Sequence, residues 1–193
     1  MLEIFKGKQI LAGMAIGLGM VANIAAPNPI LGAFLFSLGL LVVICMQLKL
    51  YTGQVGFYHK KNKNLIGMLF DNWCGATWIV STYTTITPDA AEKIKLIAEN
   101  KFSKSVWALF FAGMLCGMLI HIAVKCKENN LITVLAVMVF ILIGAEHCVA
   151  DFPLIFFLSP SWKLIGKFIL IILGNSLGAM FVETYSDWAG IQE

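Results

Sequence analysis

The chain has 193 residues, of which 59% are hydrophobic and 13% are charged, and its mean hydropathy is +0.83. Soluble domains usually hold about 45 to 50% apolar residues, so this composition predicts a polytopic protein embedded in a lipid bilayer. The length has room for about six spans of roughly 20 residues and for a single domain, residues 1–193. The formal net charge of +3 comes from 14 lysines and no arginine, which argues against a guanidinium clamp on phosphate and against nucleic acid as a partner.

The five cysteines are scattered without the spacing of metal ligands. They are interpreted as small buried hydrophobes. We therefore expect no metal and no cofactor.

The hydropathy pattern predicts spans at residues 10–26, 30–51, 65–83, 106–124, 131–158 and 164–182. Between the third and fourth spans, Ile94, Ile97 and Ala98 alternate with charged residues, which predicts an amphipathic surface helix within residues 86–105. Thr87 and Pro88 form a plausible cap and first turn for this connector.

Two halves of the chain resemble one another. The stretch AGMAIG at residues 12–17 returns as AGMLCG at 112–117, and DNWCG at 71–75 returns as GNSLG at 174–178. We therefore expect one repeat over residues 8–84 and a second over residues 106–184. With three spans in each repeat, the second must enter the bilayer from the opposite side, so the fold class is an all-α membrane protein built as two inverted repeats.

Lysines in short loops set the expected orientation. Residues 59–63 and 125–127 are lysine-rich, and both fall on the same side as Lys6 and Lys8. Because cytoplasmic loops carry an excess of lysine, we expect both termini in the cytoplasm.

Each half contains a polar interruption in an apolar run, KLYTGQ at residues 49–54 and EHCVAD at 146–151. Non-helical backbone at this depth is tolerated only where it is buried in protein or lines a water-filled cavity. Paired interruptions of this kind point to a transport site near the midplane of the bilayer. His147, an ionisable residue at the centre of a span, is a functional candidate, although it can also be a hydrogen-bonded packing residue.

Several short motifs occur in the same order as in the formate/nitrite transporter family, and the sequence resembles that family over nearly its whole length. They are Ala12-Gly13 with Ile16-Gly17, FSLGL at 36–40, KLYTGQ at 49–54, AENK at 98–101, AEHCVAD at 145–151 and LGNSLG at 173–178. The resemblance implies an aquaporin-like fold with broken second and fifth helices, a homopentamer with one pore per subunit, and a bacterial inner membrane as the location. It implies a transporter of small monovalent weak-acid anions such as formate, nitrite, hydrosulfide or a short monocarboxylate, with protons as partners, and not an enzyme.

The resemblance also assigns roles to single residues. His147 is expected to face the permeating anion, with Thr52 opposite it, and Phe36 and Phe140 to form one apolar constriction. Lys101 is expected at the external mouth, where it attracts anions. The second, cytoplasmic constriction is expected to consist of Leu40, Leu50, Tyr51 and Ile120.

Several residues depart from the family pattern. Lys49 replaces a glutamate, Gln54 and Asp151 replace the two asparagines that end the broken segments, and Gly117 replaces an asparagine in the fourth span. Asp71-Asn72 replaces Gly-Asn, whereas Gly174-Asn175 keeps it. Lys49 and Glu146 occupy equivalent positions in the two repeats, so we expect an ion pair between them, with Asp151 as the other possible partner of Lys49.

Three alternatives remain open at the level of sequence. An aquaporin-like channel for water or a neutral solute is one, although Pro27-Asn28-Pro29 is not an Asn-Pro-Ala box. An intramembrane metal-dependent enzyme using Asp71, Glu146, His147 and Asp151 is another, and a membrane scaffold without transport is the third. The sequence leaves open which anion is carried, and whether the protein is a channel or a proton-coupled carrier.

Overall fold

A computed structural model describes residues 7–59 and 64–191 of the chain. Every element in these ranges is helical. In chain order they are α1 (Gly7–Ala25), α2 (Pro29–Cys45), α3 (Tyr51–Gln54), η1 (Val55–Phe57), α4 (Leu65–Ile86), α5 (Ala90–Ser103), α6 (Val106–Lys125), α7 (Asn130–Leu142), α8 (Cys148–Asp151), η2 (Phe152–Phe157) and α9 (Trp162–Trp188).

Polar side chains mark where the long helices begin. Asn28 accepts a hydrogen bond from the Leu31 amide at 2.9 Å, with Pro29 in the first turn. Ser105 caps α6 and Ser161 caps α9 in the same way. Each cap satisfies an amide that has no partner within its helix, which fixes the start of the helix after a loop.

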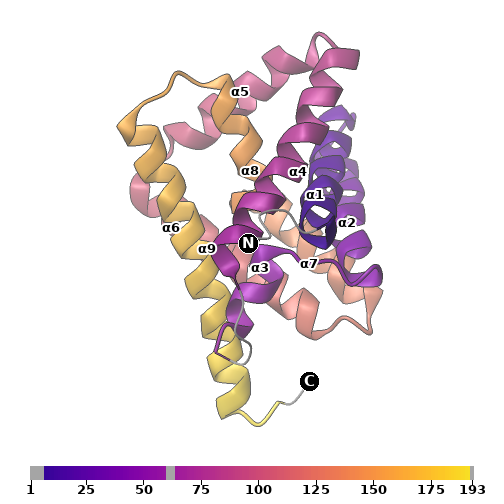
Figure 1. Cartoon of the computed structure of the whole chain (residues 1–193), viewed down its shortest axis with the longest axis vertical. Coiled ribbons are helices and arrows are strands. Elements are labelled where there is room, and N and C mark those ends of the chain that lie inside the picture. Colours follow the sequence, from indigo (N-terminus) through magenta and orange to yellow (C-terminus); the bar gives the residue numbers. More distant parts are fainter. Residues whose placement is uncertain (1–6, 60–63, 192–193) are drawn as a thin grey trace, which may run out of the picture.

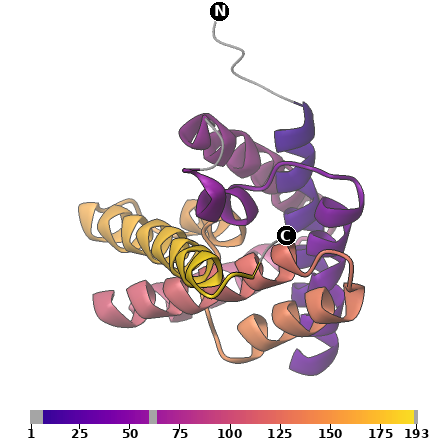
Figure 2. The same cartoon turned by 90° about the horizontal axis from the view of Figure 1, so that it is seen from below.

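The long helices are arranged as two packed pairs with the short helices between them. Helix α1 packs along α4, and α6 packs along α9, while α2 contacts α7 across the molecule. Figure 1 shows α3 and α8 between the two pairs, and Figure 2 shows α6 running beside α9 on the side away from α1. The short helices therefore lie where the two halves of the chain meet.

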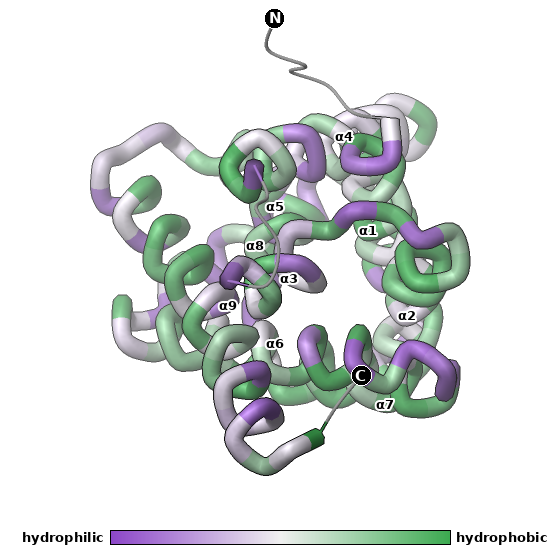
Figure 3. The backbone as a smooth tube through the Cα atoms, turned by 60° about the horizontal axis from the view of Figure 1, so that its bottom comes forward, coloured by the Kyte–Doolittle hydropathy of each residue, from purple (hydrophilic) through white to green (hydrophobic). Residues whose placement is uncertain are grey.

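Many large apolar side chains are exposed, and several polar side chains are buried within an apolar core. Large apolar residues such as Ile66, Trp107 and Trp162 are exposed, at 84%, 69% and 88% of their surface, whereas Thr52 and Asn72 are fully buried. Figure 3 shows hydrophobic residues along α2, α6, α7 and α9. By length and composition, α1, α6 and α9 can each cross a membrane, and α2, α7 and residues 148–157 are shorter apolar helices. The apolar surface is suited to contact with lipid.

Helix α5 lies within residues 86–105, and it begins later than the cap expected at Thr87 and Pro88. Thr87 is the C-cap of α4 and does not start the connector helix. Helix α5 begins at Ala90, after a turn. Ala90, Ile94 and Ala98 are completely buried on one face of α5. The connector is therefore packed onto the helical body rather than lying free on its surface.

The helix pairs α1–α4 and α6–α9 make matching contacts, with a register that differs from the sequence alignment. A Cβ added to Gly13 would lie 1.9 Å from the carbonyl oxygen of Asn72, and one added to Gly117 would lie 2.1 Å from that of Asn175. Gly13 therefore corresponds to Gly117, whereas the alignment paired it with Gly113. Gly113 and Gly117 are four residues apart in α6. The glycines of the first half therefore match those of α6 equally well when the alignment is shifted by about one helical turn.

These close approaches make glycine necessary at position 117. Gly117→Ala should lower the stability of the protein in detergent by about 1 to 3 kcal/mol, because the added methyl group displaces the backbone of α9. Gly166→Ala is the matched control, since Gly166 lies in α9 with nothing within 4 Å of an added Cβ. That control should be neutral or should stabilise by up to about 1 kcal/mol. Thermal unfolding followed by tryptophan fluorescence measures both changes, and equal effects would contradict the packing argument.

Candidate functional site

Both interruptions predicted from the sequence are breaks in helical structure. Helix α2 ends at Cys45 and α3 begins at Tyr51, after Leu50 in an extended conformation. Helix α7 ends at Leu142 and α8 begins at Cys148, after an extended His147. The intervening backbone lacks the hydrogen bonds that a continuous helix supplies, so other groups must provide them.

Asn72 supplies the bonds for the first break. Its Oδ1 accepts from the Tyr51 amide at 2.8 Å, and its Nδ2 donates to the carbonyls of Gln9 at 2.7 Å and Lys49 at 3.0 Å. The Lys49 amide in turn donates to the carbonyl of Lys8 at 3.2 Å. One buried amide side chain thus connects α4, the N-terminal end of α1 and both sides of the break.

Asn175 makes the corresponding set of bonds at the second break. Its Oδ1 accepts from the Cys148 amide at 2.9 Å, and its Nδ2 donates to the carbonyls of Gly113 and Glu146, each at 2.8 Å. The Glu146 amide donates to the carbonyl of Ala112 at 3.2 Å. In the sequence both asparagines match the Asn of the family's Gly-Asn pair, and the structure shows the bonds that they make.

The residue after each asparagine reaches the break of the other half. Trp73 Nε1 donates to the carbonyl of Cys148 at 3.2 Å, and its ring stacks on Phe152 with centroids 4.2 Å apart. Ser176 Oγ and the Tyr51 hydroxyl are hydrogen-bonded at 2.8 Å. Trp73 and Ser176 were not selected from the sequence, because a tryptophan or a serine in an apolar helix carries no signal of such a contact.

Thr52 and His147 meet where the two breaks face one another. The distance between Thr52 Oγ1 and His147 Nε2 is 2.9 Å, and both side chains are buried. His147 Nδ1 accepts from the Ala150 amide at 3.2 Å, so the neutral ring carries its proton on Nε2 and donates it to Thr52. The structure therefore brings together the pair that the sequence analysis expected, in a defined tautomer.

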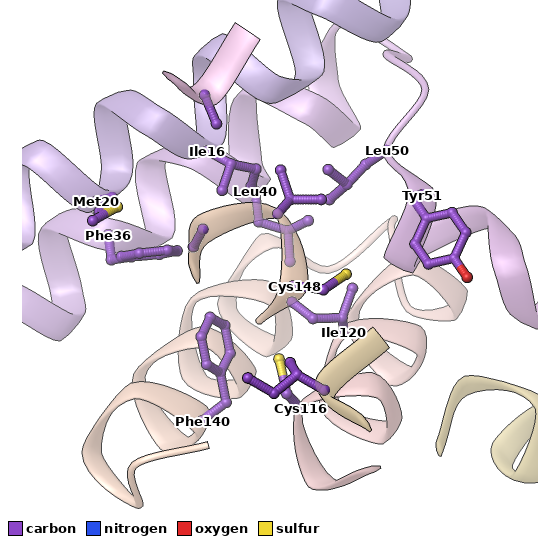
Figure 4. Packing of buried hydrophobic residues seen from close by; sticks show 14 of the residues in the cluster. Ile16, Met20, Phe36, Leu40, Leu50, Tyr51, Cys116, Ile120, Phe140 and Cys148 are labelled. Atoms are coloured by element: carbon purple, nitrogen blue, oxygen red, sulfur yellow. The ribbon is translucent and has the colours of Figure 1, made fainter. Parts of the chain in front are cut away.

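Apolar side chains surround this polar pair. The rings of Phe36 and Phe140 lie edge to face with centroids 5.6 Å apart, and the Phe140 centroid lies 6.1 Å from that of His147. The other expected constriction residues are also buried in the same apolar cluster, which Figure 4 shows in close view: Leu40, Leu50, Tyr51 and Ile120. Small polar groups at the centre are thus enclosed by hydrocarbon.

A group of four charged residues, two buried carboxylates and two partly buried lysines, lies beside the second break. Lys101 binds both Glu146 and Asp151, the latter at 2.9 Å, and Lys104 binds Glu146 at 2.7 Å. Lys104 also donates to the carbonyl of Gly144 at 3.1 Å. We refer to Lys101, Lys104, Glu146 and Asp151 as the charge cluster. Lys104, which no sequence motif singles out, completes the cluster.

The expected ion pair between Lys49 and Glu146 is wrong. The Lys49 side chain is exposed, whereas both oxygens of Glu146 are bonded to lysines on and just after the connector helix. Asp151, the alternative partner of Lys49, is bonded to Lys101. Lys49 and Glu146 occupy equivalent positions in the sequence but are not in contact. Lys101 and Lys104 of the connector region bind Glu146 instead.

The charge cluster keeps Lys101 protonated. Desolvation by burial lowers the pKa of Lys101, but the carboxylates of Asp151 and Glu146 outweigh it and raise that pKa above its usual value. The charge of Lys101 is therefore balanced by two carboxylates.

A cavity of about 60 Å³ lies between the charge cluster and the rings of Phe36 and Phe140. Its walls include Phe36, Lys101, Phe140, His147 and Asp151. The volume accommodates a few water molecules or one small anion. Substrate-sized space is thus present on the connector side of His147.

Another buried charged group lies away from these residues and was not recognised in the sequence. His121 Nε2 and Glu183 Oε2 are 2.8 Å apart, and Lys125 Nζ donates to the same oxygen at 2.9 Å. The place of His121 near the end of the fourth predicted span is typical of an interfacial polar residue, but His121 is completely buried beside Phe57. Nothing in the spacing of α6 indicated a partner on α9.

The residues expected in a metal site do not converge on one point. Both Glu146 oxygens are held by lysines, and Asp71 lies buried on α4 beside Asn72. Among the residues that the structure describes, the one group whose ligand atoms lie within 4.8 Å of one another is elsewhere and comprises His59, Glu183 and Asp187. The alternative of a metal-dependent enzyme centred on His147 therefore has no support from the geometry.

Two solved structures share this architecture. A pentameric formate channel with formate bound matches with a TM-score of 0.76 at 21% identity, and the match covers 96% of each chain. An FNT family ion channel matches with a TM-score of 0.80 at 20% identity, over 96% of this chain and 89% of that one. Comparison with curated proteins gives no match. These similarities show the fold alone.

Family membership rests on the sequence profile. The profile described as Formate/nitrite transporter matches residues 5–189, which is nearly the entire chain. It includes both breaks, the charge cluster and the two asparagines. The chain is a member of the formate/nitrite transporter family.

Proposed function

We propose that this protein is a membrane channel or transporter for small monovalent weak-acid anions, such as formate, nitrite, hydrosulfide or a short monocarboxylate. The observation that carries the proposal is the bond between Thr52 and His147, at the junction of the two breaks and enclosed by apolar side chains. Family membership supports it, and so does the formate bound to the similar pentameric channel.

Passage through this region depends on how the substrate carries its charge. An anion that sheds its water between apolar side chains incurs a large desolvation cost, whereas its protonated, neutral form incurs much less. Phe36 and Phe140 form one such apolar constriction, and Leu40, Leu50, Tyr51 and Ile120 form the other. His147, with Thr52, offers hydrogen bonds and a proton between them, so the weak acid and its proton move together.

The proposed architecture is six spans arranged as two inverted repeats, residues 8–84 and 106–184, joined by the connector 86–105. The matching bonds of Asn72 and Asn175 support this division. With three spans per repeat, the repeats have opposite orientations. The lysine-rich loops favour cytoplasmic termini, and the family favours the bacterial inner membrane as the location.

We further propose that the subunits assemble as a homopentamer with one pore in each subunit. The large exposed apolar side chains supply surface for lipid and for neighbouring subunits. Native mass spectrometry in mild detergent should give a pentamer as the dominant species. Monomers or dimers alone would contradict the assembly.

The role of His147 can be tested by transport into liposomes under imposed pH gradients. Uptake by the wild type should rise as the external pH falls, because a larger fraction of the substrate is protonated. His147→Phe should reduce uptake by at least about tenfold, equivalent to about 1.4 kcal/mol. His147→Asn should keep some uptake with weaker proton coupling, and Thr52→Val should be milder because a hydroxyl supplies no net charge.

His59→Phe is the matched control for this experiment. It makes the same substitution at an exposed histidine away from the cavity. All variants should elute as the wild type does in size-exclusion chromatography. Wild-type uptake by His147→Phe would rule out the proposed role of His147 even if the protein transports anions.

A further inference from the structure

A second pocket, of about 450 Å³, opens on the surface between the end of α5 and the start of α9. It shares no lining residue with the cavity beside His147. The polar and charged side chains of its wall come from α5, from the loop before α9 and from the first turns of α9: Glu99, Ser159, Ser161, Lys163 and Lys167. We refer to it as the outer pocket.

Lys167 brings a positive charge into the wall of the outer pocket without a carboxylate to balance it. The residue is buried, with 8% of its surface exposed. Its Nζ donates to the carbonyls of Phe102 at 2.7 Å and Lys104 at 2.6 Å, at the C-terminal end of α5. Within the described part of the chain these are its only partners, and it forms no ion pair. An ammonium group has three donors, so one hydrogen and the net charge remain for an anion.

The start of α9 adds further donors to the same pocket. Ser161 Oγ accepts from the Leu164 amide at 3.1 Å, and its hydroxyl hydrogen remains for another acceptor. The amides of the first two helical residues, Trp162 and Lys163, have no partner inside the helix. Lys163 precedes Lys167 by about one turn, so both side chains project from the same face of α9. A helix N-terminus with two lysines suits a phosphate group.

The carboxylate in the wall of the outer pocket does not cancel this charge. Glu99 Oε1 lies 3.9 Å from Nζ of Lys95, and both side chains are more than half exposed. Lys104, whose carbonyl accepts from Lys167, has its own ammonium group bound to Glu146. With two lysines and one carboxylate, the lining residues carry a net positive charge.

The outer pocket opens where the bilayer meets water. Helices α6 and α9 run parallel, because glycines four residues apart on α6 contact residues four apart on α9 in the same order. Both helices can cross a membrane, and both therefore begin at the same end of the molecule. Trp107 and Trp162, in their first turns, are 69% and 88% exposed. Exposed tryptophans at one end of spanning helices mark the interface, which is the depth of lipid headgroups.

We propose that the outer pocket binds the phosphate group of an anionic phospholipid from the surrounding bilayer. The phosphate oxygens accept from Lys163, from Lys167 and from the N-terminal end of α9, while Phe102 and Leu164 contact the apolar part of the lipid. A zwitterionic lipid carries a cation beside its phosphate, which the two lysines repel, so the pocket prefers a headgroup with net negative charge. Because Lys167 also bonds to the end of α5, the bound lipid stabilises the junction of the connector helix with α9.

The test measures lipid binding to the purified protein in detergent by native mass spectrometry. Dioleoyl phosphatidylglycerol is compared with dioleoyl phosphatidylcholine, which has the same acyl chains and a zwitterionic headgroup. The wild type should bind phosphatidylglycerol more tightly. Lys163→Gln and Lys167→Gln should each weaken phosphatidylglycerol binding about fivefold, the effect of one lysine near a charged bilayer surface, and leave phosphatidylcholine binding unchanged.

Lys93→Gln is the matched control. It removes the same charge from an exposed position of α5 that lines neither pocket, and it should bind both lipids as the wild type does. Lys167→Gln also loses bonds to the end of α5, so its folding is checked by size-exclusion chromatography. Should it fail to fold, Lys163→Gln decides the outcome, because that variant keeps the bonds of Lys167.

Three results would overturn the proposal. The first is equal binding of the two lipids by the wild type. The second is wild-type preference for phosphatidylglycerol in Lys163→Gln. The third is displacement of phosphatidylglycerol by a large excess of inorganic phosphate, which would identify the pocket as a site for free phosphate. None of these results bears on anion transport, so the proposed function is tested separately.

Discussion

The need to pair backbone groups where water is absent governs this structure. Each broken helix exposes amides and carbonyls in the interior, and leaving them unpaired would cost several kcal/mol per group. Asn72 and Asn175 remove this cost with one side chain each, accepting one bond and donating two. The asparagines need the helix pairs to approach closely, which Gly13 and Gly117 permit. The hydrogen bonds of the asparagines therefore depend on the close packing of the helix pairs.

Pairing the backbone in this way leaves side chains free to line the interior. Because the asparagines satisfy backbone groups at both breaks, Thr52 Oγ1 and His147 Nε2 can bond to each other, while His147 Nδ1 accepts from the Ala150 amide. The charges of the carboxylates at the second break are balanced by two lysines, which α5 and the residue that follows it bring there. Within the described residues, no connector helix brings lysines to the first break, which carries an exposed lysine, Lys49, in place of a buried carboxylate.

Much of this arrangement follows from the sequence, and the remainder depends on contacts between distant segments. The apolar runs predict the helices, and the polar interruptions predict both breaks, because lipid permits few alternatives. The meeting of Thr52 and His147 was expected from family resemblance. The partners of Glu146 were not predicted correctly, because the similarity of the two halves in sequence suggested contact between Glu146 and the equivalent residue, Lys49. The register of α6 was also misassigned, because glycines spaced by one turn match equally well in two alignments.

The crossed bonds of Trp73 and Ser176 bear on how the protein is made. Trp73 in the first half donates to the backbone of the second break, and Tyr51 in the first break is bonded to Ser176 near the end of the chain. During synthesis the first half emerges before either partner exists. Its interior can therefore be completed only after α9 has been inserted. A nascent chain that stops before residue 148 lacks the partners of both the Trp73 indole and the Tyr51 hydroxyl, and one that stops before residue 176 lacks the partner of the Tyr51 hydroxyl. Translation and insertion of the last helix thus act as the final step in closing the interior.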